Sequence, residues 1–404
     1  MQVHSPVDPK LLFRMLAQLL AKVRLILNNR KFIIRFSGLV LIFILSLYLT
    51  LCLLSACTSP AWANWLQVNN SFVPFLIDPA ILSCLHCPVR MWQKISLASK
   101  EEDPGYQPGN LVLYRITDNP DKDYLMFEHG AEQRIVRRFS TRPFLFMGTV
   151  VFIPQDPARF IWEWNRGRVR ICANVTVSRK DEEMVIPLSF VDSLAQLRDL
   201  YVSYNVTPTM LAGTLLGWFR ECSFTPHTTD VDMGILAEEQ SELLDQALED
   251  SDVYRLYWRI GTVRHKFEYS VYVNTTKVDF FYVYNRQNSN VSSYYGVIIA
   301  KRVKVIYEVP KVTKDSICAG DLLGRLMYVP CSVEDIILRE FGETWREDRH
   351  SANYSGSAVG KSIAGYVKFS DEQFYSYVYA SEKEQWLKQK ERRKAQGRLQ
   401  RKLM

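Results

Sequence analysis

The segment Ala212–Gly234, AGTLLGWFRECSFTPHTTDVDMG, constrains the fold of this 404-residue chain more than any other part of it. Two aspartates one residue apart, Asp230 and Asp232, alternate with the apolar Val231 and Met233. On a β-strand, positions i and i+2 point to the same face, so both carboxylates project together while the apolar residues pack on the other side. The segment therefore predicts a strand with one buried face and one acidic face.

Two adjacent carboxylates suit a magnesium ion, which prefers oxygen ligands and is usually held by one or two carboxylates together with substrate phosphates. Upstream, Gly213 and Thr214 open a short apolar stretch, and backbone N–H groups at the start of a helix can bind a phosphate. Taken singly, the aspartates could be solvated charges and the Gly-Thr pair an ordinary turn. Their combination predicts a site for a nucleotide pyrophosphate, with Mg²⁺, or alternatively Mn²⁺, as the cofactor.

Three further side chains are candidates for the same site. Arg220 can bind a phosphate oxygen through its planar guanidinium, although an ion pair with Glu221 is an equal alternative. His227 lies just before the acidic strand and can contact the phosphate or the metal's ligands. Asp279 lies inside the apolar run Val278–Val283, where an unpaired carboxylate is costly. We expect Asp279 to ligate the metal or accept a proton, unless it forms a structural ion pair.

These motifs resemble the fukutin/LicD family. The resemblance spans about residues 194–345 and rests on the segments Leu211–Cys222, Pro226–Asp232, Lys277–Tyr284, Tyr328–Asp335 and Glu340–Trp345. It implies an α+β fold with a nucleotidyltransferase-like catalytic domain. It also implies that Asp230, Asp232 and Asp279 form the catalytic and metal-binding set, beside the phosphate-binding candidates Gly213, Thr214, Arg220 and His227.

The resemblance further implies a lumenal transferase that moves an alditol phosphate, ribitol 5-phosphate in fukutin, from a CDP-activated donor to a glycan hydroxyl. CDP-ribitol would be the donor, an O-glycan of a glycoprotein the acceptor, and other glycosyltransferases the partners in a complex. LicD relatives that use CDP-choline leave the donor open. A catalytically inactive fukutin-fold scaffold is the main alternative, and a receptor ectodomain of unrelated fold is the third interpretation.

The segment Phe36–Cys57 carries no charged residue. At about 1.5 Å per residue it is roughly 33 Å long, enough to cross a bilayer core of about 30 Å. Residues 1–35 hold seven Lys or Arg, and the next basic residue after the segment is Arg90. The positive-inside rule then predicts a cytosolic tail (1–35), a single type II transmembrane helix (36–57) and a lumenal remainder in the Golgi or endoplasmic reticulum membrane. A buried soluble helix, or a signal peptide cleaved near Ala63, are the alternatives.

Sequons and cysteines agree with a lumenal location. Glycosylation acceptors are predicted at Asn69, Asn174, Asn274, Asn290 and Asn353, and a sixth sequon at Asn205 is weakened by Pro208. The six cysteines beyond the apolar segment are Cys84, Cys87, Cys172, Cys222, Cys318 and Cys331. These six cysteines can form three disulfides in fifteen possible ways, and the sequence does not choose among them. Cys318 and Cys331 are near enough in the sequence to close a loop. The cluster Cys84–Cys87 lacks a second ligand pair, so zinc is not expected.

The remaining chain divides into a proline-interrupted stem (58–110), a β-rich accessory domain (111–189), the catalytic domain (190–380) and a charged helical tail (381–404). Predicted strands are Leu111–Ile116, Tyr124–Phe127, Phe144–Ile153, Arg159–Trp164, Val169–Val177, Lys266–Val273, Lys277–Tyr284 and Val297–Val309, and predicted helices are Phe190–Tyr204, Glu238–Leu256 and Glu334–Gly342. The net charge of +7 comes from the two ends of the chain, which argues against a nucleic-acid-binding core.

Overall fold

The computed structural model describes residues 74–87, 89, 93–100, 109–177, 183–263, 265–298, 303–348 and 362–368, with two short pieces at 17–18 and 43–47. The predicted span Phe36–Cys57, apart from residues 43–47, lies outside the described residues, as do the tail 381–404 and nearly all of 1–35. None of the helices in these ranges combines the length and apolarity that crossing a bilayer requires. The span and both tails stay predictions.

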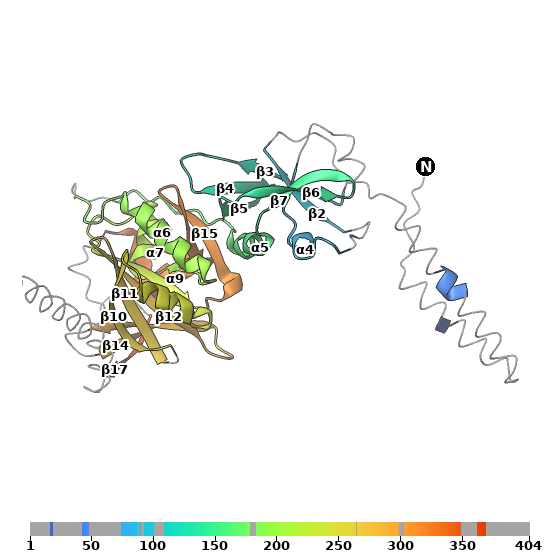
Figure 1. Cartoon of the computed structure of the whole chain (residues 1–404). Helices are drawn as coiled ribbons and strands as arrows, with labels where there is room; N and C mark the ends of the chain where they lie inside the picture. The colour runs from blue at the N-terminus through green and yellow to red at the C-terminus, as the bar shows by residue number, and fades with distance from the viewer. Residues whose placement is uncertain are drawn as a thin grey trace, which may run out of the picture.

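The described residues form two sheets that lie beside each other, with a helix between them (Figure 1). The first sheet has the strand order β5-β4-β3-β2-β1-β7-β6. Its strands are β1 (Phe75–Leu76), β2 (Ile95–Ser99), β3 (Leu111–Thr117), β4 (Tyr124–His129), β5 (Glu132–Arg137), β6 (Thr141–Phe146) and β7 (Thr149–Pro154), and a short helix α4 (Pro79–Leu82) follows β1.

The first sheet begins earlier than the sequence predicted. Strands β1 and β2 fall in the range 58–110 that was assigned to a stem. Although β1 is only two residues long, it pairs with β2 on one side and with β7 on the other. A strand this short leaves no alternation to detect, so only the tertiary pairing reveals it.

The predicted strand Arg159–Trp164 is wrong, because this stretch is part of helix α5 (Pro157–Arg166). The side chain of Asp156 accepts a hydrogen bond from the backbone N–H of Arg159, and Pro157 occupies the first turn. Asp at the N-cap followed by Pro is a helix start signal. The Asp carboxylate accepts a hydrogen bond from one of the free backbone N–H groups of the first turn, and Pro has no N–H that needs a partner. Phe160 and Trp164, one turn apart, both pack into the core of the first sheet.

The second sheet carries the segment with the acidic pair. Its main order is β15-β16-β8-β9-β12-β13-β14-β17, and the hairpin β10-β11 joins it through β11, which also pairs with β12. The strands are β8 (Thr209–Met210), β9 (Asp230–Leu236), β10 (Tyr254–Thr262), β11 (His265–Val273), β12 (Thr276–Asn285), β13 (Val291–Ile298), β14 (Val303–Pro310), β15 (Ile317–Leu322), β16 (Arg325–Pro330) and β17 (Ile363–Lys368).

The helices of the second part are α6 (Phe190–Ser203), α7 (Ala212–Glu221), α8 (Glu242–Glu249) and α9 (Val333–Phe341), with short 3₁₀ turns η1 (Ala237–Glu239), η3 (Lys314–Ser316) and η4 (Glu343–Arg346). The predictions for α6 and α9 are confirmed almost to the residue. The predicted helix Glu238–Leu256 is shorter, because β10 already begins at Tyr254. The predicted single run Val297–Val309 is split between β13 and β14. The mixed α+β class is confirmed.

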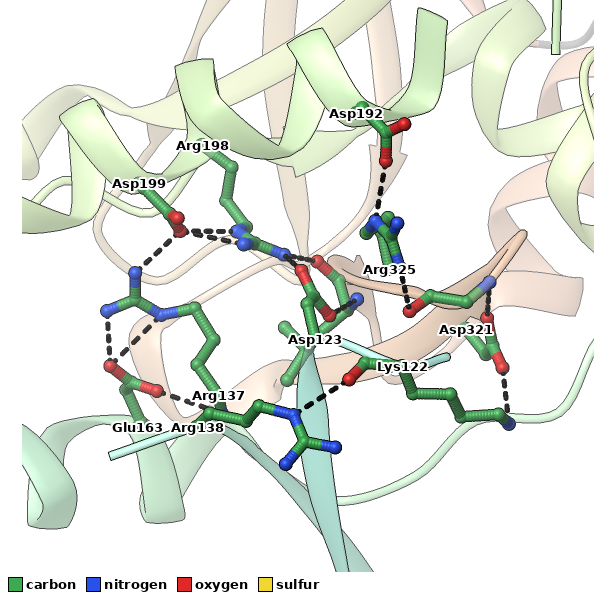
Figure 2. Close-up of polar contacts among 12 residues, drawn as sticks. Lys122, Asp123, Arg137, Arg138, Glu163, Asp192, Arg198, Asp199, Asp321 and Arg325 are labelled. Carbon is green, nitrogen blue, oxygen red and sulfur yellow. Dashed lines mark hydrogen bonds and ion pairs between the residues drawn. The ribbon is translucent and has the colours of Figure 1, made fainter. Parts of the chain in front are cut away.

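A polar network joins the two sheets (Figure 2). Arg198 of α6, which is almost fully buried, pairs with Asp123 at 2.8 Å and with its neighbour Asp199 at 2.7 Å. Arg137 of β5 reaches both Asp199 and Glu163. Every guanidinium here faces at least one carboxylate, as buried charge requires. The contacts fix α6 against the edge of the first sheet.

Three disulfides cross-link the described cysteines: Cys84–Cys87, Cys172–Cys222 and Cys318–Cys331. The expected loop closure between Cys318 and Cys331 is confirmed, and it ties β15 to the residue that follows β16. Cys172–Cys222 fastens the coil after α5 to the C-terminal end of α7, where Cys222 adopts a left-handed conformation. The sequence alone left these pairings open.

Candidate functional site

The acidic site forms where β9 and β12 run parallel. The register places Asp230 beside Lys277, and Asp232 beside Asp279. Because residues paired across neighbouring strands share a face, all four side chains emerge on one side of the sheet. Val231 and Val278 point the other way and are fully buried. The predicted acidic face of the strand is thus present, and Asp279 joins it from the neighbouring strand.

A lysine occupies the middle of this group. The Lys277 ammonium lies 2.7 Å from an Asp279 carboxylate oxygen and 3.2 Å from an Asp230 carboxylate oxygen. The Lys277 side chain is 25% exposed, the Asp230 side chain 34% and the Asp279 side chain 8%. Asp279 therefore does form the ion pair that the sequence left open as an alternative, and its partner is two residues away on the same strand.

Strand β11 supplies the next layer around Asp279. Ser270 pairs with Asp279 across the two strands and donates its hydroxyl to the carboxylate at 2.5 Å. The indole N–H of Trp258, on β10, donates to the same Ser270 oxygen. Glu268 lies two residues before Ser270 on this strand and is buried. Ser270, itself held by Trp258, keeps Asp279 in one orientation, as a supporting layer does for a functional carboxylate.

The start of α7 holds Asp232. The Gly213 N–H donates to the Asp232 carboxylate at 3.1 Å, and the Thr214 hydroxyl accepts from the Asp232 N–H at 2.8 Å. A Cβ on Gly213 would lie 3.3 Å from that carboxylate oxygen, so glycine permits the close approach. Ala212, just before, has a φ of 45°, a strained conformation for alanine. The Gly-Thr pair was predicted to contact phosphate; in the structure it positions Asp232.

Arg220 forms the ion pair with Glu221 that the sequence left open as the alternative to a phosphate contact. Its guanidinium is buried, and it contacts the Glu221 carboxylate, the Glu347 carbonyl at 2.9 Å and the Asp348 carboxylate at 3.2 Å. These contacts tie α7 to the segment after η4, and Trp345 within η4 packs on Phe219 of α7. A guanidinium suits both a phosphate and a carboxylate, and in this fold carboxylates lie next to it. The contact of Arg220 with a phosphate stays a prediction.

His227 lies half-buried in the turn that leads into β9. Its predicted contact with a phosphate or with the metal's ligands stays a prediction. Thr228, the next residue, donates its hydroxyl to the Asp230 carbonyl at 3.1 Å, so this turn does fix the start of the acidic strand.

Burial and like charge act together on the site carboxyls. Burial raises the pKa of Asp232 well above its usual value, and the charges of Asp230 and Asp279 raise it further. Burial also raises the pKa of Asp279, although Lys277 and Ser270 oppose the shift. The site therefore holds more negative charge than it can stabilise alone, and a cation placed there lowers its free energy.

A divalent cation fits the chemistry of this donor set. The oxygens are hard carboxylate ligands, and a cationic group, the Lys277 ammonium, already lies between two of them. As the side chains stand, no group of three His, Cys, Asp or Glu within the described ranges is closed enough to ligate a metal. The predicted set of Asp230, Asp232 and Asp279 thus shares a face but is not assembled around a single point.

Sequence reasoning missed Lys277, Ser270 and Trp258. A signal for Lys277 was present, because Lys277 and Asp279 are two residues apart on a predicted strand and must share a face. No such signal exists for Ser270 and Trp258. Their contact with Asp279 depends on the register of the hairpin β10-β11 against β12.

The buried Glu340 of α9 should make the stability of the fold depend on pH. It is 6% exposed and accepts a hydrogen bond from the Tyr294 hydroxyl. Burial raises its pKa from 4.5 to about 7, although the Tyr294 hydrogen bond opposes the shift. The folded state then keeps a proton that the unfolded chain releases as pH rises from 4.5 to 7. Stability falls across that window by up to about 3 kcal/mol from this group.

We expect Glu340→Gln to flatten the fall in stability over this pH range and to raise the unfolding temperature at pH 8. Glu343→Gln, three residues on and exposed, is the matched control and leaves the slope unchanged. Thermal unfolding followed by circular dichroism from pH 4.5 to 8 measures both. An unaltered slope in Glu340→Gln contradicts the assignment.

Two regions of the chain match known protein families. Residues 205–332, which hold β9, β12 and the whole acidic site, match the family described as LicD/FKTN/FKRP, nucleotidyltransferase domain. Residues 61–170, which hold the first sheet, match the domain described as W02B3.4-like, N-terminal domain. The resemblance to the fukutin/LicD family is thus confirmed for the region that holds the acidic site.

Individual relatives agree. The chain is 29% identical over 328 residues to the Caenorhabditis elegans protein W02B3.4, covering 77% of this chain and 82% of that protein. It is 29% identical over 266 residues to T07A5.1 of the same organism, covering 64% and 68%. Human ribitol-5-phosphate transferase FKTN is 26% identical over 246 residues, covering 57% of this chain and 52% of the human protein. These likenesses support a transferase that acts in glycosylation.

Proposed function

We propose that the chain transfers an alditol phosphate from a CDP-linked donor to a hydroxyl of a protein-bound glycan, with CDP-ribitol as the first donor to test. One observation carries the proposal. Asp230, Asp232 and Asp279 emerge on one face of two parallel strands, inside the region that matches the LicD/FKTN/FKRP family. Hard carboxylate oxygens gathered on one face support a site for a divalent ion and a nucleotide pyrophosphate.

Each residue has a distinct part in the proposed reaction. Asp230 and Asp232 would hold Mg²⁺ or Mn²⁺, with Asp279 as a third ligand unless it accepts the acceptor's proton, and the ion would supply positive charge against the donor pyrophosphate. Gly213 and Thr214 keep Asp232 in place, and Ser270 keeps Asp279 in place. The acceptor oxygen forms a bond to the phosphorus of the alditol phosphate, the bond to CMP breaks, and the acceptor proton passes to a site carboxylate, for which Asp279 is the candidate.

The test is release of CMP by the purified chain from CDP-ribitol, CDP-glycerol and CDP-choline, each with a glycan acceptor, in Mg²⁺ and in excess chelator. The proposal expects metal-dependent release with one of the alditol donors. Release from CDP-choline alone would assign the chain to phosphocholine transfer instead. Donor binding without CMP release from any of them would favour the inactive scaffold.

We also propose that the chain is a single-pass type II protein of the Golgi or endoplasmic reticulum membrane with both sheets in the lumen. Three predicted glycosylation sites, Asn174, Asn274 and Asn290, are exposed, as an acceptor must be. The three disulfides suit an oxidising compartment.

Treatment of the membrane-expressed chain with an N-glycosidase should increase its electrophoretic mobility. The triple variant Asn174→Gln, Asn274→Gln, Asn290→Gln should lose a large part of that shift. Unchanged mobility of the original chain would contradict the orientation, and a mature N-terminus near Asn64 would replace the anchor by a cleaved signal peptide.

A further inference from the structure

The Lys277 ammonium lies between two of the three carboxylates of the site. Lys277 projects from β12 on the same face as Asp279, and its ammonium bridges Asp279 and Asp230 on two different strands. The Trp258 ring lies 5.8 Å from the ammonium and limits its approach from the β10 side. With one quarter of its side chain exposed, Lys277 is not enclosed, so it can leave this position without unfolding its surroundings.

The ammonium and a divalent ion compete for the same oxygens. A metal ion that binds Asp230, Asp232 and Asp279 together needs the Asp230 and Asp279 oxygens that Lys277 now contacts. The positively charged ammonium of Lys277 and a divalent metal ion would repel each other strongly if both lay within a few ångströms in this partly buried site. The lysine must therefore move when the metal binds.

After that movement the lysine remains tethered beside the site on a stem of four carbons. Its next available partner is a negative group bound to the metal from the solvent side, and a pyrophosphate oxygen is such a group. Lysine acts there as a flexible point charge that follows the phosphate into place.

We propose that Lys277 is a resident counterion which a divalent metal ion displaces, and that the displaced ammonium then binds a phosphate oxygen of the nucleotide-linked donor. The inference rests on the proposed metal-dependent transfer, and it makes Lys277 a donor-binding residue in addition to the three carboxylates.

The test measures Mn²⁺ and CDP binding, without turnover, in the full-length chain and in Lys277→Met, which keeps the length of the side chain and removes its charge. Without the competing ammonium, Mn²⁺ should bind about tenfold more tightly, the effect of roughly one pKa unit of charge interaction. At saturating Mn²⁺, CDP should bind about tenfold more weakly, because its phosphate loses a cationic partner. Mn²⁺ titration by electron paramagnetic resonance and CDP titration by calorimetry give the two constants.

Lys311→Met removes an exposed lysine in the loop just after β14 and should change neither constant. Lys277→Arg keeps the charge and should leave the Mn²⁺ affinity close to that of the original chain, so it tests the idea even if Lys277→Met folds poorly. Equal or weaker Mn²⁺ binding by Lys277→Met would overturn the counterion role, and unchanged CDP binding would overturn the phosphate contact.

These outcomes separate the inference from the proposed function. If Asp232→Asn abolishes Mn²⁺ binding while Lys277→Met leaves it unchanged, the metal site stands and only the lysine's role falls. If neither the original chain nor Lys277→Met binds Mn²⁺ at millimolar concentration, both the metal-dependent function and the inference fail.

Discussion

Asp232→Asn should lower the rate of metal-dependent CMP release on the order of 10²–10³-fold, since it removes one negative ligand from a site that must hold a cation against the pyrophosphate. Asp230→Asn and Asp279→Asn should have comparable effects. The substitution at Asp232 keeps the size of the side chain, and an amide oxygen can still accept the Gly213 N–H. The loss should therefore reflect charge and not a displaced α7.

Folding of the Asp232→Asn variant should survive, and its metal-free form should unfold at the same or a higher temperature. The reason is that burial and the charges of Asp230 and Asp279 disfavour an ionised Asp232 in the folded protein. Glu238→Gln, with its side chain 56% exposed and beyond the end of β9, is the control and should be nearly silent. Full activity of Asp232→Asn, or equal activity in excess chelator, would show that the site is assigned wrongly.

Arg166→Met should destabilise the folded chain by about 3–5 kcal/mol, the usual cost of leaving a buried charge without its partner. Arg166 at the end of α5 pairs with Glu239 of η1 at 3.2 Å, and the two side chains are 9% and 3% exposed. Thr207 completes the cluster, because its N–H donates to Glu239 at 2.9 Å and its hydroxyl contacts both partners. The pair joins the first sheet's helix to the turn that directly follows β9.

The double variant Arg166→Met, Glu239→Gln should recover a large part of that loss, because no buried charge then lacks a partner. Arg138→Met, which breaks the solvent-exposed pair with Asp118, is the control and should cost less than about 1 kcal/mol. Urea unfolding of the four proteins gives the free energies. A single variant Arg166→Met as stable as the original chain would mean that the pair does not hold the two sheets together.

Prediction from the sequence succeeded where the signal was local. Alternation of Asp and apolar residues gave the two faces of β9, and helical spacing gave α6 and α9. It failed at α5 although a local signal existed in Asp156 and Pro157, because the aromatic residues between them and Trp164 favoured a strand. It also failed for β1, which is too short to have a pattern of its own.

For the candidate site, the sequence supplied the chemical groups and not their partners. It identified Asp230 and Asp232 as sharing a face, Asp279 as a third candidate carboxylate, and Gly213 and Thr214 as candidates for the same site. It left Arg220 open between a phosphate and an ion pair with Glu221, and the fold brings both Glu221 and Asp348 to that guanidinium. It treated Lys277 only as part of a motif, whereas the parallel register of β9 and β12 brings its ammonium to Asp230.

By itself, the sequence determined which face of β9 is acidic, where α6 and α9 lie, and which carboxylates and which glycine turn are the candidates for the site. These properties depend on residues a few positions apart, whose relative directions the backbone period fixes. The tertiary structure alone decided the disulfide pairing, the register that joins Asp279 to Asp232, and the choice of partner for Arg220 and Lys277. Those depend on contacts between residues tens of positions apart, and charged side chains accept any complementary group that the fold places within reach.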